Sequence, residues 1–94
     1  MLLLSLTYKT DISAADTHME AHMAWVKTGY DQGWFVASGR KIPRTGGIIL
    51  ARGQRDEIED FCDNDPFVVY GVADYEIIEC AFTTAAAGFE GLKA

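Results

Sequence analysis

The segment MLLLSLTY (Met1–Tyr8) opens the chain with an apolar side chain at almost every position. Successive side chains of an extended chain point to opposite faces, so Leu2, Leu4 and Leu6 share one face while Leu3 lies on the other. A strand with one face in water should alternate between apolar and polar residues. This segment therefore predicts a β-strand in a sheet that is covered on both faces. The same double-sided apolar character recurs in WFV (34–36) and IIL (48–50).

The rest of the chain divides into helices and strands around this first strand. Apolar spacing, turn residues and cap residues predict helices from Asp16 or Thr17 to about Asp31, from Asp56 to about Asp63 and from Asp65-Pro66 to Gly71, and strands at Trp34–Gly39, Gly46–Arg52 and Asp74–Phe82. This order is the ferredoxin-like βαββαβ arrangement. We predict an α+β domain over residues 1–83, whose helices cover one face of a four-stranded antiparallel sheet. The pattern assigns no structure to the Ala- and Gly-rich tail, 84–94.

Local signals add three details to the helices. Residues 11–16 are small and polar and predict a loop before the first helix. Asp56, with Glu59 three residues later, resembles a capping box that opens the second helix. The core stripe of the first helix is predicted from its spacing to be Met19, Met23, Val26 and Tyr30.

The apolar content of so short a chain predicts a partner subunit. Of 94 residues, 49% are apolar, yet a chain of this length buries only about 64% of its unfolded surface. Leaving the second face of the sheet in water would cost several kcal/mol, at about 25 cal/mol per Å² of apolar surface. We therefore predict a homodimer in which two sheets meet face to face and form one barrel-like core.

Charge and composition argue against several classes of partner. The chain carries 14 acidic and 8 basic residues, for a net charge of −6, and its basic residues are scattered, so we expect no nucleic-acid binding. The apolar start is short, and no later run approaches the about 18 apolar residues of a membrane span, so we expect neither a signal peptide nor a membrane anchor. Cys62 and Cys80 lack zinc-type spacing and are expected to be core thiols in the reducing cytoplasm. The glycines spell no phosphate loop or dinucleotide fingerprint, so we expect no cofactor.

Several segments together resemble a known family. They are HMAWV (22–26), DQG (31–33), VASG (36–39), GGIILA (46–51), DPF (65–67), YGV (70–72) and the final strand up to Phe82. In this order and spacing they are similar to the YciI-like (YCII-related) family, over roughly Met1 to Phe82. The resemblance implies a dimeric α/β barrel in which each subunit has a pocket containing a histidine and an aspartate proposed as catalytic.

The resemblance carries over to individual residues. The histidine corresponds to His22 and the aspartate to Asp65, and the small turn that closes the second strand corresponds to Ser38 and Gly39. In the family a proline commonly follows that glycine, whereas Arg40 and Lys41 stand there in this chain. Two cations at a pocket rim would attract an anionic ligand, or would simply be solvated.

His22 and Asp65 also have ordinary structural explanations. Histidine has the side-chain pKa nearest neutrality and suits proton transfer, but His22, one position from the predicted stripe, also fits a partly buried helix residue. Asp-Pro is an ordinary helix start, so Asp65 is expected to cap a helix. The two roles are compatible, because backbone donors hold a capping carboxylate ionised. We therefore predict His22 as the acid–base group and Asp65 as the residue that orients it.

Other candidates are weaker. His18 and His22 lie four residues apart, but Glu20 between them does not make an HExxH motif, so we expect no metal site. Ser38 lacks a nucleophile elbow and is a turn residue or a hydrogen-bond donor to a ligand. Trp34 is better explained as a core or dimer contact than as a stacking platform. It nevertheless joins Ser38, Gly39 and Arg40 as a candidate substrate-binding residue.

Three functions follow from these residues. The leading hypothesis is a cofactor-free lyase or isomerase in which His22 moves a proton on a small, cyclic or carbonyl-bearing metabolite. In the family, dehydrochlorination of a hydroxyquinone looks like one precedent. The alternative is a non-catalytic ligand-binding or accessory module with the same dimeric fold. A third hypothesis is a purely structural dimer, in which His22 and Asp65 have only packing and capping roles.

Overall fold

The computed structural model describes residues 1–93 and contains the predicted order of elements. Besides the helices α1 and α2, the chain has a short α-helix, α3, after α2, and a 3-10 helix, η1, near its C-terminus. The bounds are β1 Leu2–Tyr8, α1 Ile12–Asp31, β2 Phe35–Arg40, β3 Gly46–Ala51, α2 Arg55–Asp63, α3 Pro66–Val69, β4 Ala73–Glu79 and η1 Glu90–Leu92. The predicted ferredoxin-like α+β fold is confirmed.

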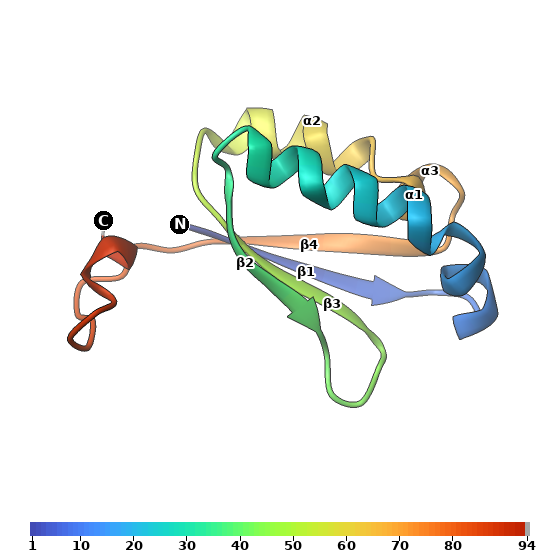
Figure 1. The fold of residues 1–94 in the computed structure, drawn as a ribbon, viewed down its shortest axis with the longest axis horizontal. Coiled ribbons are helices and arrows are strands. Elements are labelled where there is room, and N and C mark those ends of the chain that lie inside the picture. The colour runs from blue at the N-terminus through green and yellow to red at the C-terminus, as the bar shows by residue number, and fades with distance from the viewer. Residues whose placement is uncertain (94) are drawn as a thin grey trace.

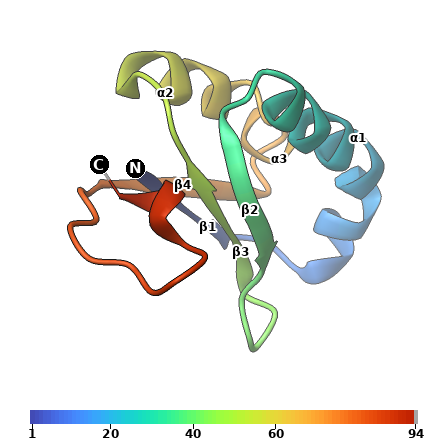
Figure 2. The same ribbon diagram turned by 60° about the vertical axis from the view of Figure 1, so that its left-hand side comes forward.

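The four strands form one antiparallel sheet in the order β2-β3-β1-β4. Figures 1 and 2 show α1, α2 and α3 on the same side of this sheet. The even-numbered leucines of β1 face the helices: Leu2, Leu4 and Leu6 are all buried. No helix within residues 1–93 is both long and apolar enough to cross a bilayer.

Helix α1 begins earlier than predicted and buries a different stripe. The helix starts at Ile12, within the segment predicted as a loop. Residues 13–15 are Ser-Ala-Ala, and alanine has the highest helix propensity of all residues. Met23 and Tyr30, predicted in the core, are 52% and 41% exposed. The buried face is displaced by about one residue and consists of Ala15, His22, Trp25, Val26 and Gly29.

Gly29 explains how α1 sits so close to β2. A Cβ atom on Gly29 would lie 2.3 Å from the ring of Phe35, a distance at which atoms clash. The missing side chain lets the Phe35 ring pack directly against the helix backbone. Trp25 and Tyr30 then hold the same ring edge-on, at centroid distances of 5.5 and 5.8 Å.

The predicted capping box of α2 is wrong. The N-cap is Gln54, and it makes no side-chain cap hydrogen bond. Glu59 instead accepts a hydrogen bond from the Nε of Arg55, one turn earlier (2.8 Å). Asp56 lies in the first turn, where its negative charge is stabilised by the positive end of the helix dipole. Ile58 is buried, and so is Cys62, which the sequence predicts as a core thiol.

Strand β2 contains a bulge that reverses its facing pattern. Phe35 pairs with Ala51 and Ala37 pairs with Leu50, so Val36 is an extra residue without a partner on β3. The sequence pattern placed Ser38 on the same side as Trp34 and Val36. The bulge instead places Ser38, opposite Ile49, on the helix-covered side together with Phe35.

The sheet face away from the helices, here called the outer face, carries a row of apolar side chains. Leu3 pairs with Leu50 on one side and with Ile78 on the other, and Ala37 pairs with Leu50, so the row crosses all four strands. Leu3 and Leu50 are half-buried and Ile78 is 44% exposed. No helix within residues 1–93 covers this face (Figures 1 and 2).

The segment after β4 leaves the sheet near the N-terminus (Figure 1). β4 ends at Glu79 rather than at the predicted Phe82. Phe82 forms an isolated parallel bridge with Lys93, which closes a loop around the η1 turn. Phe89 in this loop is 60% exposed.

Candidate active site

Asp65 is fixed by the start of α3. Asp65 is the N-cap and Pro66 the first helical residue, as the Asp-Pro pair predicts. The backbone N–H of Phe67 donates to Asp65 Oδ1 over 2.9 Å, so the predicted capping role is present. The side chain is nevertheless fully buried, which is costly for a carboxylate unless it has further partners.

Those further partners come from α1 and β4. His22 Nδ1 lies 2.8 Å from Asp65 Oδ1, and the Tyr75 hydroxyl donates to Asp65 Oδ2 over 2.6 Å. Burial, and then the charge of Asp65, raises the pKa of Tyr75 far above its ordinary value, so its hydroxyl keeps the proton that it donates. A carboxylate can only accept, so His22 must donate from Nδ1 when Asp65 is ionised. Three donors thus converge on one buried carboxylate.

The orientation of the His22 ring is fixed by stacking as well as by Asp65. The ring lies parallel to that of Phe67, with centroids 4.0 Å apart and 3° between the planes, and packs against Trp25 at 5.8 Å. Trp25 is itself anchored, since its Nε1 donates to the Phe61 carbonyl over 2.9 Å. Because Nδ1 is bonded to Asp65, Nε2 is the ring nitrogen left for a ligand.

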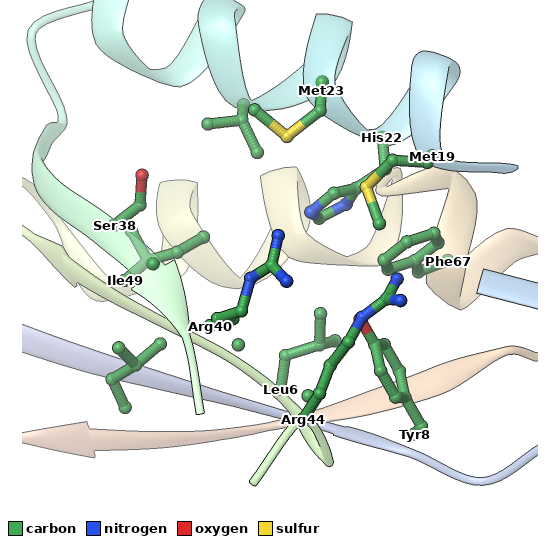
Figure 3. A pocket seen from close by; sticks show the side chains of 15 residues that line it. Leu6, Tyr8, Met19, His22, Met23, Ser38, Arg40, Arg44, Ile49 and Phe67 are labelled. Carbon is green, nitrogen blue, oxygen red and sulfur yellow. The ribbon is translucent and has the colours of Figure 1, made fainter. Parts of the chain in front are cut away.

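His22 lines a cavity of about 250 Å³ between α1 and the sheet (Figure 3). The helix contributes two flexible methionines, Met19 and Met23, and the sheet contributes the side chains of β1, β2 and β3. The walls are mostly apolar, consisting of Leu6, Tyr8, Met19, Met23, Val26, Ile48, Ile49 and Phe67. The polar groups that reach the cavity are few, which is the usual composition of a small-molecule site.

Two arginines point into this cavity from the β2–β3 hairpin (Figure 3). Arg40 ends β2, and Arg44 lies in the loop that follows. Arg44 Nη2 donates to Asp16 Oδ1 over 2.7 Å. Hydrogen bonds to Asp16 and then to the Tyr8 hydroxyl raise the pKa of Arg44.

The candidate residues from the sequence do not all meet. His22 and Asp65 are in contact, and Ser38, Gly39 and Arg40 line the cavity. Ser38 Oγ is 2.8 Å from the Tyr30 hydroxyl, which positions it at the rim. Trp34 does not line the cavity: it packs edge-on against Phe61 at 5.1 Å, so the geometry gives its predicted binding role no support.

His18 and Lys41 also lie apart from the cavity. His18 stacks on Tyr70 with centroids 4.3 Å apart, and Lys41 donates to the Thr7 hydroxyl over 3.0 Å. Within residues 1–93, no three His, Cys, Asp or Glu side chains gather as metal ligands would.

Sequence reasoning missed Tyr75 and Arg44 as members of the site. Tyr75 had a usable signal, since it alternates with Ile77 on the last strand and so shares the helix-covered face. Arg44 had none, because its direction depends on the path of the hairpin loop.

A family model described as the YCII-related domain matches residues 1–81. Among solved structures, the chain is similar to 5-chloro-2-hydroxyhydroquinone dehydrochlorinase from Burkholderia phenoliruptrix AC1100, solved in complex with 2,5-dihydroxybenzoquinone. The two are 18% identical, with a TM-score of 0.70 over 85% of this chain and 93% of that one. At this identity the likeness establishes the fold alone. No curated protein matches the chain.

Proposed function

The chain belongs to the YCII-related domain family, and from its site we propose an enzyme that moves a proton on a small cyclic or carbonyl-bearing metabolite. The observation that carries this proposal is the 2.8 Å contact between His22 Nδ1 and Asp65 at the wall of an apolar cavity. Histidine titrates near neutrality, and a fixed carboxylate partner stabilises the imidazolium that forms when it accepts a proton. A cavity that buries the ligand shields this transfer from water.

The reaction is of the lyase or isomerase type. His22 Nε2 removes a proton from the substrate, and the electron pair left behind either expels a leaving group from the adjacent carbon or is reprotonated elsewhere on the same molecule. The imidazolium returns its proton to the product or to water, which restores the enzyme. Asp65 keeps the neutral ring in the tautomer protonated at Nδ1 and stabilises the imidazolium, and Tyr75 and the Phe67 amide hold Asp65 in place.

The structural neighbour suggests where to look for a substrate. Its printed name describes a dehydrochlorinase of a chlorinated hydroxyhydroquinone. When such a ring loses HCl, it releases a proton and a chloride ion, and His22 would accept the proton. Halogenated hydroxyhydroquinones, which form a quinone when they lose the halide and a proton, are therefore the first compounds to test, followed by related enols.

We also propose that the active form is a homodimer joined through the outer face. The row through Ala37, Leu50, Leu3 and Ile78 is a continuous apolar strip across the sheet. Covering it with the same row of a second copy would remove the apolar surface that one subunit leaves in contact with water. The cavity lies on the other side of the sheet, and none of its lining residues follows Phe67, which supports residues 1–83 as the functional domain.

We propose a reducing, cytoplasmic setting, in which Cys62 and Cys80 remain free thiols. A strongly oxidising compartment would be expected to convert the half-buried Cys80 into a mixed or intermolecular disulfide. Mass spectrometry of the protein isolated from its native cells checks this, since a disulfide-bonded Cys80 would contradict the cytoplasmic assignment.

The test uses the two histidines of α1 as a matched pair. We expect His22→Asn to lower the rate on an active hydroxyhydroquinone or enol by about 10²–10⁴-fold, the usual contribution of a general acid–base group. His18→Asn should leave the rate within about twofold, because His18 is on the same helix but outside the cavity. The rate is followed by the absorbance of the quinone product.

Two outcomes would contradict the proposal. An unchanged rate in His22→Asn would remove His22 from the mechanism. Ligand binding without turnover across the whole panel would favour the non-catalytic binding module. Circular dichroism of both variants ensures that a lost rate is not lost folding.

A further inference from the structure

Arg40 and Arg44 bring two guanidinium groups to one side of a mostly apolar cavity (Figure 3). We propose that this cavity binds a small carboxylic acid as its monoanion, with the carboxylate on Arg40 and the rest of the molecule against the apolar wall. The inference rests on the proposed function for its site but concerns recognition, and it names the substrate class: a single-ring or similarly small monocarboxylate.

The charges at the rim favour one negative charge. Arg44 is already paired with Asp16 at 2.7 Å, so that pair contributes no net charge. No ion pair within residues 1–93 involves Arg40, which leaves its charge uncompensated. Lys41, next in the chain, turns to Thr7 instead of lining the cavity. The rim therefore offers one net positive charge, which a carboxylate matches and a dianionic phosphate exceeds.

The shape of the polar group also favours a carboxylate. A guanidinium presents parallel N–H donors whose spacing matches the two oxygens of a carboxylate. Arg44, although paired, directs its remaining donors toward the same cavity and can share one ligand oxygen. Arg40 is exposed to solvent, which leaves its guanidinium free for a ligand, and the bulge in β2 places it on the helix-covered side of the sheet, where it lines the cavity.

The size of the cavity limits the rest of the ligand. A cavity of about 150 Å³ is enough for benzene. The 250 Å³ here therefore accommodates one ring with a carboxylate and a further small substituent. Phe67 and Leu6 border the apolar end, and His22 meets the same space from α1, so a ring held by Arg40 would present its edge to Nε2.

The experiment measures binding instead of turnover. Benzoate, benzamide and phenyl phosphate are titrated into the ¹⁵N-labelled protein, and dissociation constants are taken from amide shifts. We expect benzoate to bind about tenfold or more tightly than benzamide, which has the same shape without the charge. Arg40→Gln should weaken benzoate about tenfold to a hundredfold and leave benzamide unchanged. Lys41→Gln, which removes the same charge from the neighbouring residue, should change benzoate binding by about twofold at most.

Several results would overturn the inference. They are equal binding of benzoate and benzamide, no binding of benzoate, equal losses in Arg40→Gln and Lys41→Gln, or tighter binding of phenyl phosphate than of benzoate. The result is independent of catalysis, since His22→Asn should still bind benzoate. A failed rate assay with intact benzoate binding would thus count against the proton-transfer enzyme and not against the carboxylate site.

Discussion

Replacing Asp65 with alanine tests how much of the fold depends on the candidate site. A helix cap alone would be worth about 1 kcal/mol. In the structure the same carboxylate also accepts from His22 and Tyr75, at 2.8 and 2.6 Å. Asp65→Ala therefore removes one cap and leaves two buried donors without an acceptor.

The expected loss follows from these three contacts. Each buried donor left without a partner costs about 1–3 kcal/mol, and the lost cap adds about 1. His22 borders the cavity, where water can replace part of the lost hydrogen bond, so Asp65→Ala should lower the free energy of unfolding by about 3–5 kcal/mol. That loss is a large fraction of the free energy of unfolding of a typical domain, which is about 5–15 kcal/mol.

Urea unfolding followed by circular dichroism measures the loss. The protein concentration is kept constant, because subunit association would make stability depend on it. The double variant Asp65→Ala/Tyr75→Phe should be more stable than Asp65→Ala alone by about 1–3 kcal/mol, since it also removes the hydroxyl that Asp65→Ala leaves unpaired. A loss of only about 1 kcal/mol in Asp65→Ala, with no recovery in the double variant, would refute the shared-carboxylate reasoning.

Two further predictions concern the thiols and the outer face. Burial, followed by the charge of Asp65, raises the pKa of the Cys62 thiol from 9.0 to about 12. Iodoacetamide at pH 8 should therefore modify Cys80 and leave Cys62 unmodified until urea is added, as mass spectrometry would show. Because the unfolded chain loses the Cys62 proton at lower pH than the folded protein, stability should fall as the pH rises from 9 toward 12, and less steeply in Cys62→Ala. Rapid labelling of Cys62 in the folded protein would contradict this. Leu3→Glu places a charge in the middle of the outer-face row and should turn the proposed dimer into a monomer in sedimentation experiments, whereas Ile42→Glu, at a loop position that is 95% exposed, should not. A monomeric wild-type protein would rule the dimer out.

Much of the fold could be predicted because it depends on patterns that are local in the sequence. The double-sided apolar strands and the Asp-Pro helix start identify the sheet and the position of Asp65 without reference to distant residues. The phase of α1 was harder to predict. From the sequence, His22 is a polar residue at the edge of the stripe. Its burial is compensated by Asp65, 43 positions later, which accepts a hydrogen bond from Nδ1.

The same limit applies to the rest of the site. The pairing of His22 with Asp65 was available only through the family resemblance, since neither residue alone distinguishes catalysis from packing or capping. Gly29 gave no sign that it lies against Phe35, because a glycine within a helix carries no apolar signal of its own. The direction of Arg44 depends on the loop that carries it.

The extra residue in β2 determines which side chains a ligand meets. Deleting Val36 would make β2 a regular strand and leave Ser38 and Arg40 facing the ligand. If Val36 instead paired with Leu50 in place of Ala37, the alternation beyond it would shift by one, so that Gly39 would face the ligand and Arg40 would face the proposed partner subunit. Ligand preference would then change without any substitution among the residues that line the site. Chains of this family should accordingly be compared by whether β2 has this bulge, because residues at the same aligned position can otherwise face opposite sides of the sheet.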